Sequence, residues 1–378
     1  MVAIGTLGAF GIAAGTAFGV QAATGSTVSA AGSITVPSTD PAVAFGGRGW
    51  TWGPGSSGGS GYRGTTTVPG GSTGSTVAAA TEATEDQLVG VVDITTVLGY
   101  QDAEAAGTGM VLTSDGRVLT NNHVVEGATS ITVTVLSTGD SYEATVVGTD
   151  PTDDVAVLQL DYTTGLDPVQ VDDDPVAVGD AVTAVGNAGG EAGTAAAAGT
   201  VTALDRSITA TDSSGQDAEE LTGLIEVAAD VEAGDSGGPL YDAEGDVTGM
   251  STAASSTGGQ AYAIPIDTAL SIADQIVGGV DDATVHQGYP AFLGISVLAS
   301  GTGGATVADV VPGGPAATAG LAAGDVITAI GGTAIGSADD VSTVLGSHSP
   351  ADDVTVTWTD TAGRSQTATV TSTTGPAD

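Results

Sequence analysis

The sequence has 378 residues, with 45 Asp and Glu against 5 Arg and no Lys, which gives a formal net charge of −40. The length predicts two domains with connecting segments. The charge argues against binding of nucleic acid or of anionic membranes, because both need basic side chains. The absence of Cys excludes disulfide bonds, and with only 3 His neither a metal site nor another cofactor is expected.

The first 39 residues carry no charge, and residues 4–23 form an apolar stretch rich in Gly and Ala. This stretch is long enough for the core of a signal peptide or for a membrane span. The triplet Val20-Gln21-Ala22 resembles a small-residue cleavage site. We predict that residues 1–24 are a signal peptide or membrane anchor, and that the protein is secreted or held at the outer face of the cytoplasmic membrane. A buried core helix is the alternative.

The next segment, residues 25–85, consists mainly of Gly, Ser, Thr and Ala. Its densest part, GGRGWTWGPGSSGGSGYRG, offers too little apolar area to offset the entropy lost on ordering. The segment therefore predicts a disordered linker between the apolar leader and a folded unit.

Short β-type runs separated by Gly and Asp turns follow from residue 88. One of them, Gly109–Thr120, reads as a hairpin around Ser114-Asp115-Gly116. The pattern predicts an all-β barrel or sandwich over residues 86–279, closed by a helix with Asp267 as its N-cap and Gly278-Gly279 as its stop. The other predicted strands span residues 88–100, 131–137, 142–149, 155–160, 180–186, 199–205, 223–228, 246–252 and 260–266.

A smaller unit is predicted over residues 287–374, after a short linker. Its pattern gives strands, a short Ala-rich helix, a further strand, a helix capped by Ser337 and two closing strands. This order predicts a small α+β domain.

The segment Gly234-Asp235-Ser236-Gly237-Gly238-Pro239-Leu240 carries the strongest chemical signal. A serine hydroxyl becomes a nucleophile when a base takes its proton, and glycines let backbone N–H groups converge on a developing oxyanion. Ser236 is the predicted nucleophile, and the N–H groups of Gly234, Asp235 and Ser236 are the predicted oxyanion donors. A Gly-rich turn with an incidental Ser is the alternative.

A base for Ser236 must come from one of three histidines. His123 follows a predicted strand in Thr120-Asn121-Asn122-His123, whereas His286 falls in the linker and His348 in a polar turn. His123 is therefore the best-placed candidate.

The third member of such a site is a carboxylate that orients the imidazole. The segment 150–158 offers Asp150, Asp153 and Asp154. Asp154 directly precedes an apolar strand, so burial is most plausible there, while Asp150 and Asp153 are typical of turns and caps. Asp153 remains the alternative to Asp154.

The order His123, Asp154, Ser236, in the motifs TNNHVV, TDDVAVLQL and GDSGGPL, resembles the trypsin-like serine proteases of the HtrA/Deg family, and most closely their secreted actinobacterial branch. The similarity runs from about residue 88 to the C-terminus. It implies a mainly β fold with a pair of perpendicular six-stranded barrels, and a serine endopeptidase with its His-Asp-Ser triad in the cleft between them. It also implies a homotrimer.

The C-terminal unit resembles a PDZ domain. Phe292-Leu293-Gly294-Ile295 matches the loop whose N–H groups capture a peptide's C-terminal carboxylate. The helix at 338–345 would form the other wall of the groove. A PDZ-like fold that only packs against the protease is the alternative.

Asp230 lies six residues before Ser236, a position that in trypsin-like proteases forms the base of the primary specificity pocket. An acid there would select Arg or Lys, and Arg48 and Arg63 would then be self-cleavage sites. HtrA relatives usually carry a small residue at this place and an aspartate two positions earlier, where this chain has Ala228. A preference for small apolar residues therefore stays the leading expectation.

Two functions of other classes remain open. One is a PDZ-dependent chaperone or binding protein whose protease domain is latent. The other is a surface scaffold or adhesin, suggested only by the Gly- and Ser-rich stalk. Protein or peptide substrates and peptide C-termini are the expected partners.

Overall fold

A computed structural model describes residues 43–44, 77–100, 103–172, 174–187, 194–211, 219–255, 259–282, 284–298 and 303–377. The predicted leader, residues 1–24, lies outside the described residues, as does the predicted linker apart from 43–44 and 77–85.

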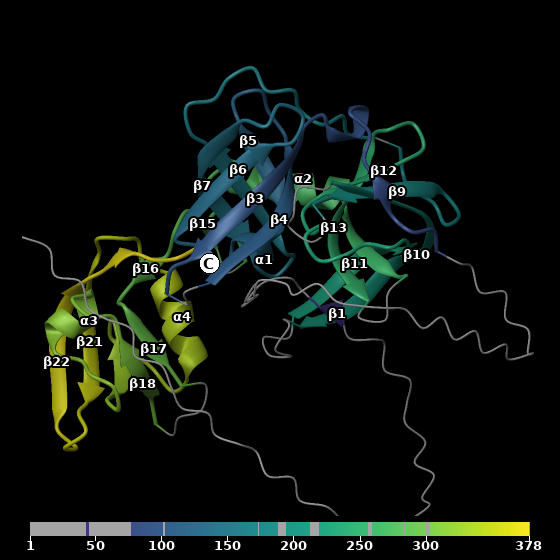
Figure 1. Ribbon diagram of the computed structural model, residues 1–378. Helices are drawn as coiled ribbons and strands as arrows, with labels where there is room; N and C mark the ends of the chain where they lie inside the picture. Colours follow the sequence, from purple (N-terminus) through teal and green to yellow (C-terminus); the bar gives the residue numbers. More distant parts are fainter. Residues whose placement is uncertain are drawn as a thin grey trace, which may run out of the picture. The chain divides into compact units, whose positions relative to one another are not determined.

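The first folded body is a closed barrel of six antiparallel strands (Figure 1). Pairing between its edge strands β7 and β8 closes the sheet, and the short strand β15 (His286–Gln287) is added to the outer side of β7. The six strands, in sheet order, are β7 (Ser141–Asp150), β6 (Ser130–Val135), β3 (Val91–Leu98), β4 (Ala103–Val111), β5 (Arg117–Thr120) and β8 (Val155–Leu160).

Strand β8 shows how the sequence builds this barrel. Its residues are almost all apolar because both of its faces are buried. Ala156 and Leu158 point into the first barrel's own core, whereas Val155 and Val157 join a second core that includes residues of the following barrel. Val155 and Val157 therefore mark the face on which the two barrels meet.

The second body is another barrel of six antiparallel strands, closed by pairing between β9 and β10. Two short strands, β1 (Val43–Ala44) and β2 (Thr81–Glu82), pair with β10, and a 3₁₀ turn, Asp86–Leu88, precedes β3. The six strands, in sheet order, are β10 (Ala195–Thr211), β11 (Glu219–Ala228), β14 (Ala261–Pro265), β13 (Val247–Ser255), β12 (Pro239–Tyr241) and β9 (Ala181–Gly186).

Two strands of this barrel differ from the sequence-based prediction. Strand β10 runs over 17 residues and not only 199–205, because register shifts against β11 absorb its charged middle, where Arg206 pairs with Glu226 at 2.8 Å. Strand β12 was not predicted, since its three residues follow two glycines and begin with proline.

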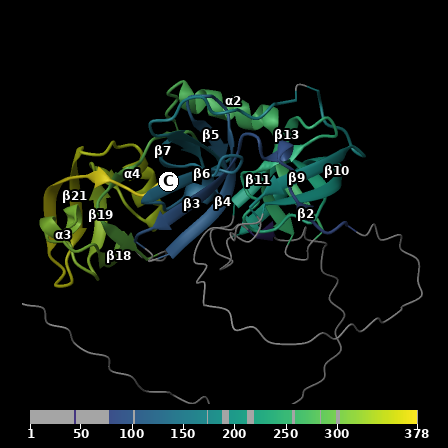
Figure 2. The same ribbon diagram turned by 45° about the horizontal axis from the view of Figure 1, so that its top comes forward.

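Helix α2 (Ile266–Val277) lies across both barrels and contacts β7, β8, β13 and β14 (Figure 2). Its buried side is formed by Ala269, Ile272, Ala273 and Ile276. The prediction of Asp267 as its N-cap was wrong: Pro265 occupies that position and Asp267 lies in the first turn, where a carboxylate interacts favourably with the helix dipole.

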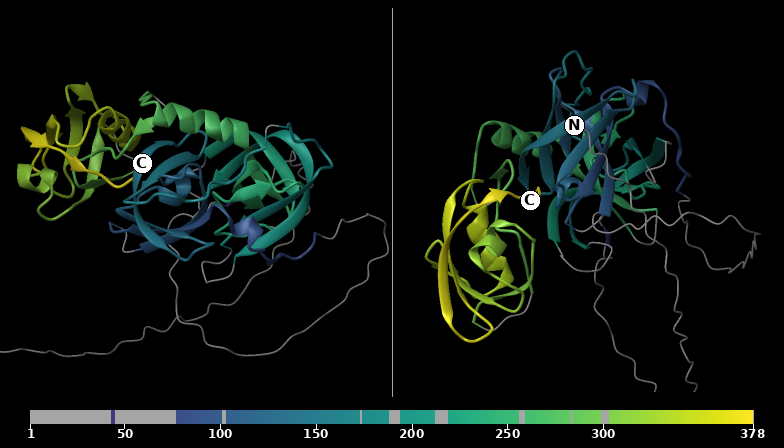
Figure 3. Two further views of the ribbon diagram at one scale, coloured as in Figure 1. Left: turned by 90° about the horizontal axis from the view of Figure 1, so that it is seen from above. Right: turned by 60° about the vertical axis from the view of Figure 1, so that its left-hand side comes forward.

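The remaining residues form a smaller α+β unit with its own apolar core. In the right-hand view of Figure 3, its yellow β21–β22 hairpin lies beside its helices. Ser337 caps α4 as predicted, in a capping box with Asp340. The elements are β16 (Ala291–Phe292), β17 (Ile295–Val297), β18 (Ala305–Val310), α3 (Pro315–Ala319), β19 (Val326–Ile330), β20 (Thr333–Ala334), α4 (Ala338–Gly346), β21 (Asp353–Thr359), β22 (Ser365–Thr371) and β23 (Thr373–Thr374).

Candidate active site

The one-turn helix α1 (Asn122–Val125) carries His123 directly after strand β5. The His123 side chain is buried, and its Nδ1 lies 3.0 Å from Oδ1 and 2.9 Å from Oδ2 of Asp154. The backbone N–H of His123 also donates to Asp154 Oδ1, at 3.0 Å. One carboxylate therefore fixes both the ring and the backbone of this histidine.

Asp154 ends the turn that leads into β8 and is 1% exposed. Its φ of +55° lies in the left-handed region, which Asp tolerates better than most residues. Asn121 Nδ2 donates to the Asp154 carbonyl at 2.9 Å and so supports this conformation.

The other two carboxylates of this segment lie elsewhere in the turn. Asp150 accepts hydrogen bonds from the N–H groups of Thr152 and Asp153, at 3.0 and 3.2 Å, and burial raises the pKa of its carboxyl. Asp154, and not the alternative Asp153, is therefore the carboxylate that contacts His123.

Ser236 lies in the tight turn before β12, where Gly234 has a φ of +104°. Ser236 Oγ donates to the carbonyl of Thr252 at 3.2 Å. The N–H of Asp235 donates to the Glu232 carbonyl at 3.2 Å. Of the three predicted oxyanion donors, the Asp235 N–H is thus already hydrogen-bonded within its own turn.

Thr252, on β13 of the second barrel, joins the nucleophile to the His123–Asp154 pair. Its carbonyl accepts the hydrogen bond from Ser236, and its hydroxyl donates to Asp154 Oδ2 at 2.5 Å. The three predicted residues therefore belong to one polar network that crosses between the barrels.

The carboxylate of Asp235 is buried beside the nucleophile and is 2% exposed. Its Oδ2 accepts the Glu232 N–H at 3.0 Å, while its Oδ1 has no hydrogen-bond partner among the described residues. Burial raises the pKa of this carboxyl to about 6, and the nearby Glu232 charge acts in the same direction.

Two further groups of predicted residues are Asp230 and the turn that begins the PDZ-like unit. Asp230 is half-buried just after β11, two residues beyond Ala228. Phe292, Leu293 and Gly294 form the turn from β16 into β17, with Gly294 at a φ of +73° and Ile295 as the first residue of β17. The roles of all these residues stay predictions.

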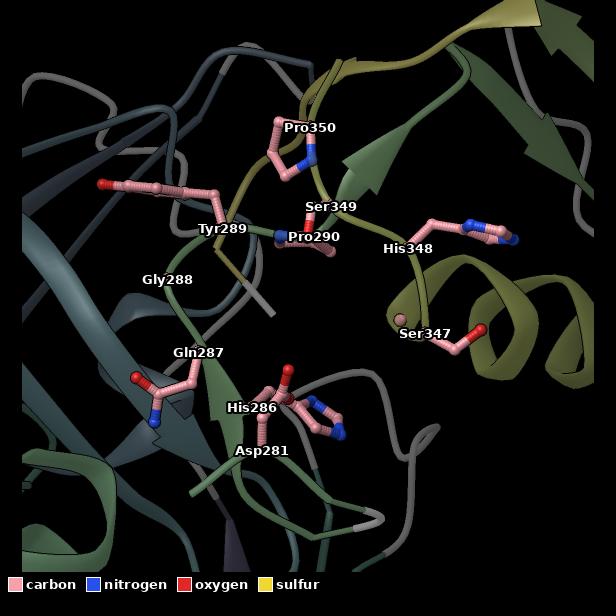
Figure 4. Close-up of a pocket in the computed structure, with 11 residues that line it drawn as sticks. Asp281, His286, Gln287, Gly288, Tyr289, Pro290, Ser347, His348, Ser349 and Pro350 are labelled. Atoms are coloured by element: carbon pink, nitrogen blue, oxygen red, sulfur yellow. The ribbon is translucent and has the colours of Figure 1, made fainter. Parts of the chain in front are cut away.

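The other two histidines line a separate small cavity (Figure 4). It lies between the connecting segment 281–290 and residues 346–350 at the C-terminal end of α4. Among the described residues, no group of three or more His, Cys, Asp or Glu side chains could hold a metal ion.

The sequence reasoning missed Thr252 and Thr108, which bond to the predicted residues, and Asn187, which bonds to Thr108. Thr252 lies on β13, Thr108 lies between two glycines of β4, and Asn187 directly follows β9. A polar residue within or next to a predicted strand was the available signal, but the sequence does not say which partner it meets.

Comparison with known proteins identifies both folded parts. Residues 107–250 match the trypsin-like peptidase domain, and residues 291–370 match the PDZ domain. The protein thus belongs to the class of mainly β, trypsin-like serine proteases that carry a C-terminal PDZ domain, which confirms the predicted fold class.

Curated relatives define the family more closely. A probable periplasmic serine endoprotease DegP-like of Halomonas elongata is 32% identical over 67% of this chain and 53% of its own length. Serine protease PepD of Mycobacterium tuberculosis is 31% identical over 74% of this chain and 63% of its own. The chain belongs to the HtrA/DegP family, and it spans about half to two thirds of the length of these relatives.

A solved structure, the HtrA-type protease AlgW with decapeptide, covers 78% of this chain and 100% of its own, at 26% identity and a TM-score of 0.43.

Among the helices of the described residues, none combines the length and the apolar character needed to cross a membrane.

Proposed function

We propose that this protein is a serine endopeptidase that hydrolyses peptide bonds of protein substrates. The observation that carries the proposal is the buried His123–Asp154 pair, linked through Thr252 to the hydroxyl of Ser236. Kinship with curated serine endoproteases supports the same reaction.

In the proposed mechanism, His123 takes the proton of Ser236 Oγ as that oxygen attacks the peptide carbonyl. Asp154 stabilises the resulting imidazolium and keeps Nδ1–H directed toward itself. The N–H groups of Gly234 and Ser236 stabilise the tetrahedral oxyanion. His123 then protonates the leaving amine, and a water molecule repeats the sequence on the acyl-enzyme to release the second product.

The test is cleavage of a peptide library by the purified full chain, together with labelling by a fluorophosphonate. We expect Ser236→Ala to abolish labelling and to lower kcat by about 10⁴-fold or more. The matched control is Ser114→Ala, which removes the hydroxyl of an exposed serine in the β4–β5 turn and should leave both readouts unchanged.

Two outcomes would contradict the proposal. Wild-type protein that neither cleaves nor is labelled, yet binds peptides, would favour the PDZ-dependent binding protein with a latent protease domain. Equal labelling of wild-type protein and the Ser236→Ala variant would place the nucleophile elsewhere.

The same library measures the preference for the residue before the scissile bond. We propose that small apolar residues are preferred there, with selection of Arg or Lys by Asp230 as the alternative. Cleavage concentrated after Arg or Lys, lost in Asp230→Asn, would support the alternative.

We propose that the PDZ domain binds peptide C-termini through the turn formed by Phe292, Leu293, Gly294 and Ile295. The left-handed Gly294 lets successive N–H groups face one point, which is how backbone turns hold a carboxylate. Such binding would deliver substrates or regulate the protease.

We also propose export of the protein, with residues 4–23 serving as signal or anchor, and assembly into a homotrimer. A curated relative that is named as periplasmic supports the location. Fractionation of cells and the mass of the purified assembly test these two proposals.

A further inference from the structure

Thr108, on β4 of the first barrel, contacts the nucleophile turn of the second barrel at two points. Its backbone N–H donates to the Ser236 carbonyl at 2.8 Å. Its hydroxyl donates to the Gly234 carbonyl at 2.7 Å. The residue is 0% exposed, so both bonds lie away from competing water.

These two bonds enclose the part of the backbone that carries the proposed oxyanion donors. The Gly234 carbonyl belongs to the same peptide unit as the Asp235 N–H, which donates to Glu232. With both ends of that peptide unit bonded, its plane is fixed. The orientations of the neighbouring Gly234 and Ser236 N–H groups are set by this plane and by the bond from Thr108 to the Ser236 carbonyl.

The Thr108 hydroxyl has a second partner besides the Gly234 carbonyl, and this partner determines which way the hydroxyl hydrogen points. The N–H of Asn187, at the end of β9, donates to Thr108 Oγ1 at 3.0 Å. A backbone N–H can only donate and a carbonyl can only accept, so the hydroxyl must accept from Asn187 and donate to Gly234. Asn187 is itself anchored, because its Nδ2 donates to Asp93 Oδ1 at 2.8 Å.

The turn is packed closely against this residue. A Cβ added to Gly237 would lie 2.1 Å from the Thr108 carbonyl oxygen, and one added to Gly238 would lie 3.1 Å from Thr108 Cγ2. The Thr108 carbonyl also accepts the Thr120 hydroxyl at 2.7 Å. The turn therefore cannot approach β4 further, and hydrogen bonds on both sides hold Thr108 in place.

We propose that Thr108 is a positioning residue for the reaction, whose hydroxyl holds the Gly234–Ser236 backbone in the conformation that binds the oxyanion. This inference rests on the proposed function. Its effect falls on the chemical step, because contacts with the rest of the substrate do not need the oxyanion donors.

The experiment compares Thr108→Val with Thr108→Ser in the full chain. Valine keeps the shape of threonine but can neither accept from Asn187 nor donate to Gly234, whereas serine can do both. For the valine variant we expect kcat to fall by about 10-fold to 100-fold, with KM within about threefold of the wild-type value. This loss is smaller than the 10²–10³-fold fall in kcat on removal of an oxyanion donor, because the donors remain present but are less well oriented. We expect the serine variant to stay within about threefold of wild type in both.

A peptide aldehyde gives a readout that a purely structural role would not move. Ser236 Oγ adds to the aldehyde carbon, and the oxygen of the adduct occupies the oxyanion site. Its Ki should rise in Thr108→Val by the same factor by which kcat/KM falls. The affinity of an uncleaved peptide, measured in the Ser236→Ala background, should not change with Thr108→Val.

Several results would overturn the positioning role. One is a kcat for Thr108→Val within threefold of wild type. Another is a fall in kcat without a matching loss of aldehyde affinity. If the valine variant does not fold, Thr108→Cys replaces it, since a thiol is a weak donor, and a kcat equal to that of Thr108→Ser would then be the contrary result. A wild-type protein that shows no hydrolysis at all would instead overturn the proposed function, and this role with it.

Discussion

At the scale of single residues, the candidate site is held by groups that each make more than one bond. Asp154 accepts from the ring and the backbone of His123 and from the Thr252 hydroxyl. A carboxylate with several donors is fixed in orientation, so the imidazole it contacts is fixed as well. The position of the His123 imidazole therefore does not rest on one exposed hydrogen bond.

Asp235 allows a prediction about pH. Its carboxyl has a pKa of about 6 in the folded protein against about 3.9 when unfolded. Between these values the native state binds more protons than the unfolded state, so the free energy of unfolding falls as pH rises from about 4 to about 6 and stays lower above it. We expect Asp235→Asn to raise that free energy at pH 7.5 by about 1–3 kcal/mol and to leave it unchanged near pH 4.

Urea unfolding of the two proteins at both pH values measures this difference. Asp140→Asn is the control, because it makes the same exchange at an exposed turn of the first barrel. Equal stabilisation at pH 4 and pH 7.5 would mean that the charge of Asp235 is not the cause.

The sequence singled out His123, Asp154 and Ser236 because each lies in a motif with strong local character, and the structure brings the three into one hydrogen-bond network. The sequence did not single out Thr108 or Thr252. The Thr108 hydroxyl meets Gly234 across 126 positions of sequence, and Thr252 meets Asp154 across 98. Such pairings are created by the closing of the barrels and leave no local pattern.

At the scale of elements, short β-type runs between Gly and Asp turns predicted most strands well. In β6, Ile131, Val133 and Val135 are buried and the residues between them face outward, which is the expected period of two. The errors occurred where charge or proline interrupts a β-type run. The middle of β10 and the whole of β12 are stabilised by neighbouring strands that a local pattern cannot show.

The turn between β16 and β17 carries the prediction for peptide binding. In the Ser236→Ala background, a fluorescein-labelled decapeptide ending in Val should bind with a free carboxylate and not as its amide. Gly294→Ala should weaken binding by about 10-fold or more, because a Cβ at positive φ is strained and would lie 3.3 Å from Val311 Cβ.

Gly332→Ala is the matched control for fluorescence anisotropy. Gly332 also has positive φ, at +86°, but an added Cβ there meets nothing within 4 Å. Equal binding of acid and amide, or equal weakening by both substitutions, would argue against a carboxylate site at Gly294.

At the scale of the whole molecule, charge is the dominant feature. With 45 acidic residues and 5 Arg, repulsion between carboxylates opposes the compact state. Raising NaCl from about 0.05 M to about 1 M shortens the screening length to about 3 Å. We therefore expect the midpoint of thermal unfolding to rise by several degrees at pH 7.5.

The same salt series at pH 4, where many carboxyls are protonated, serves as the comparison and should give a smaller rise. A midpoint that does not change with salt at pH 7.5 would show that the acidic surface carries no net repulsive cost.

The bonds between Thr252 and Asp154 and between Thr108 and Gly234 join residues of different barrels. The site of a newly synthesised chain is therefore complete only after both barrels have been made. The half that is synthesised first contains His123 and Asp154 but not Ser236. Because the proposed reaction needs all three residues, a chain cannot hydrolyse peptide bonds until its second half has been synthesised and has folded against the first.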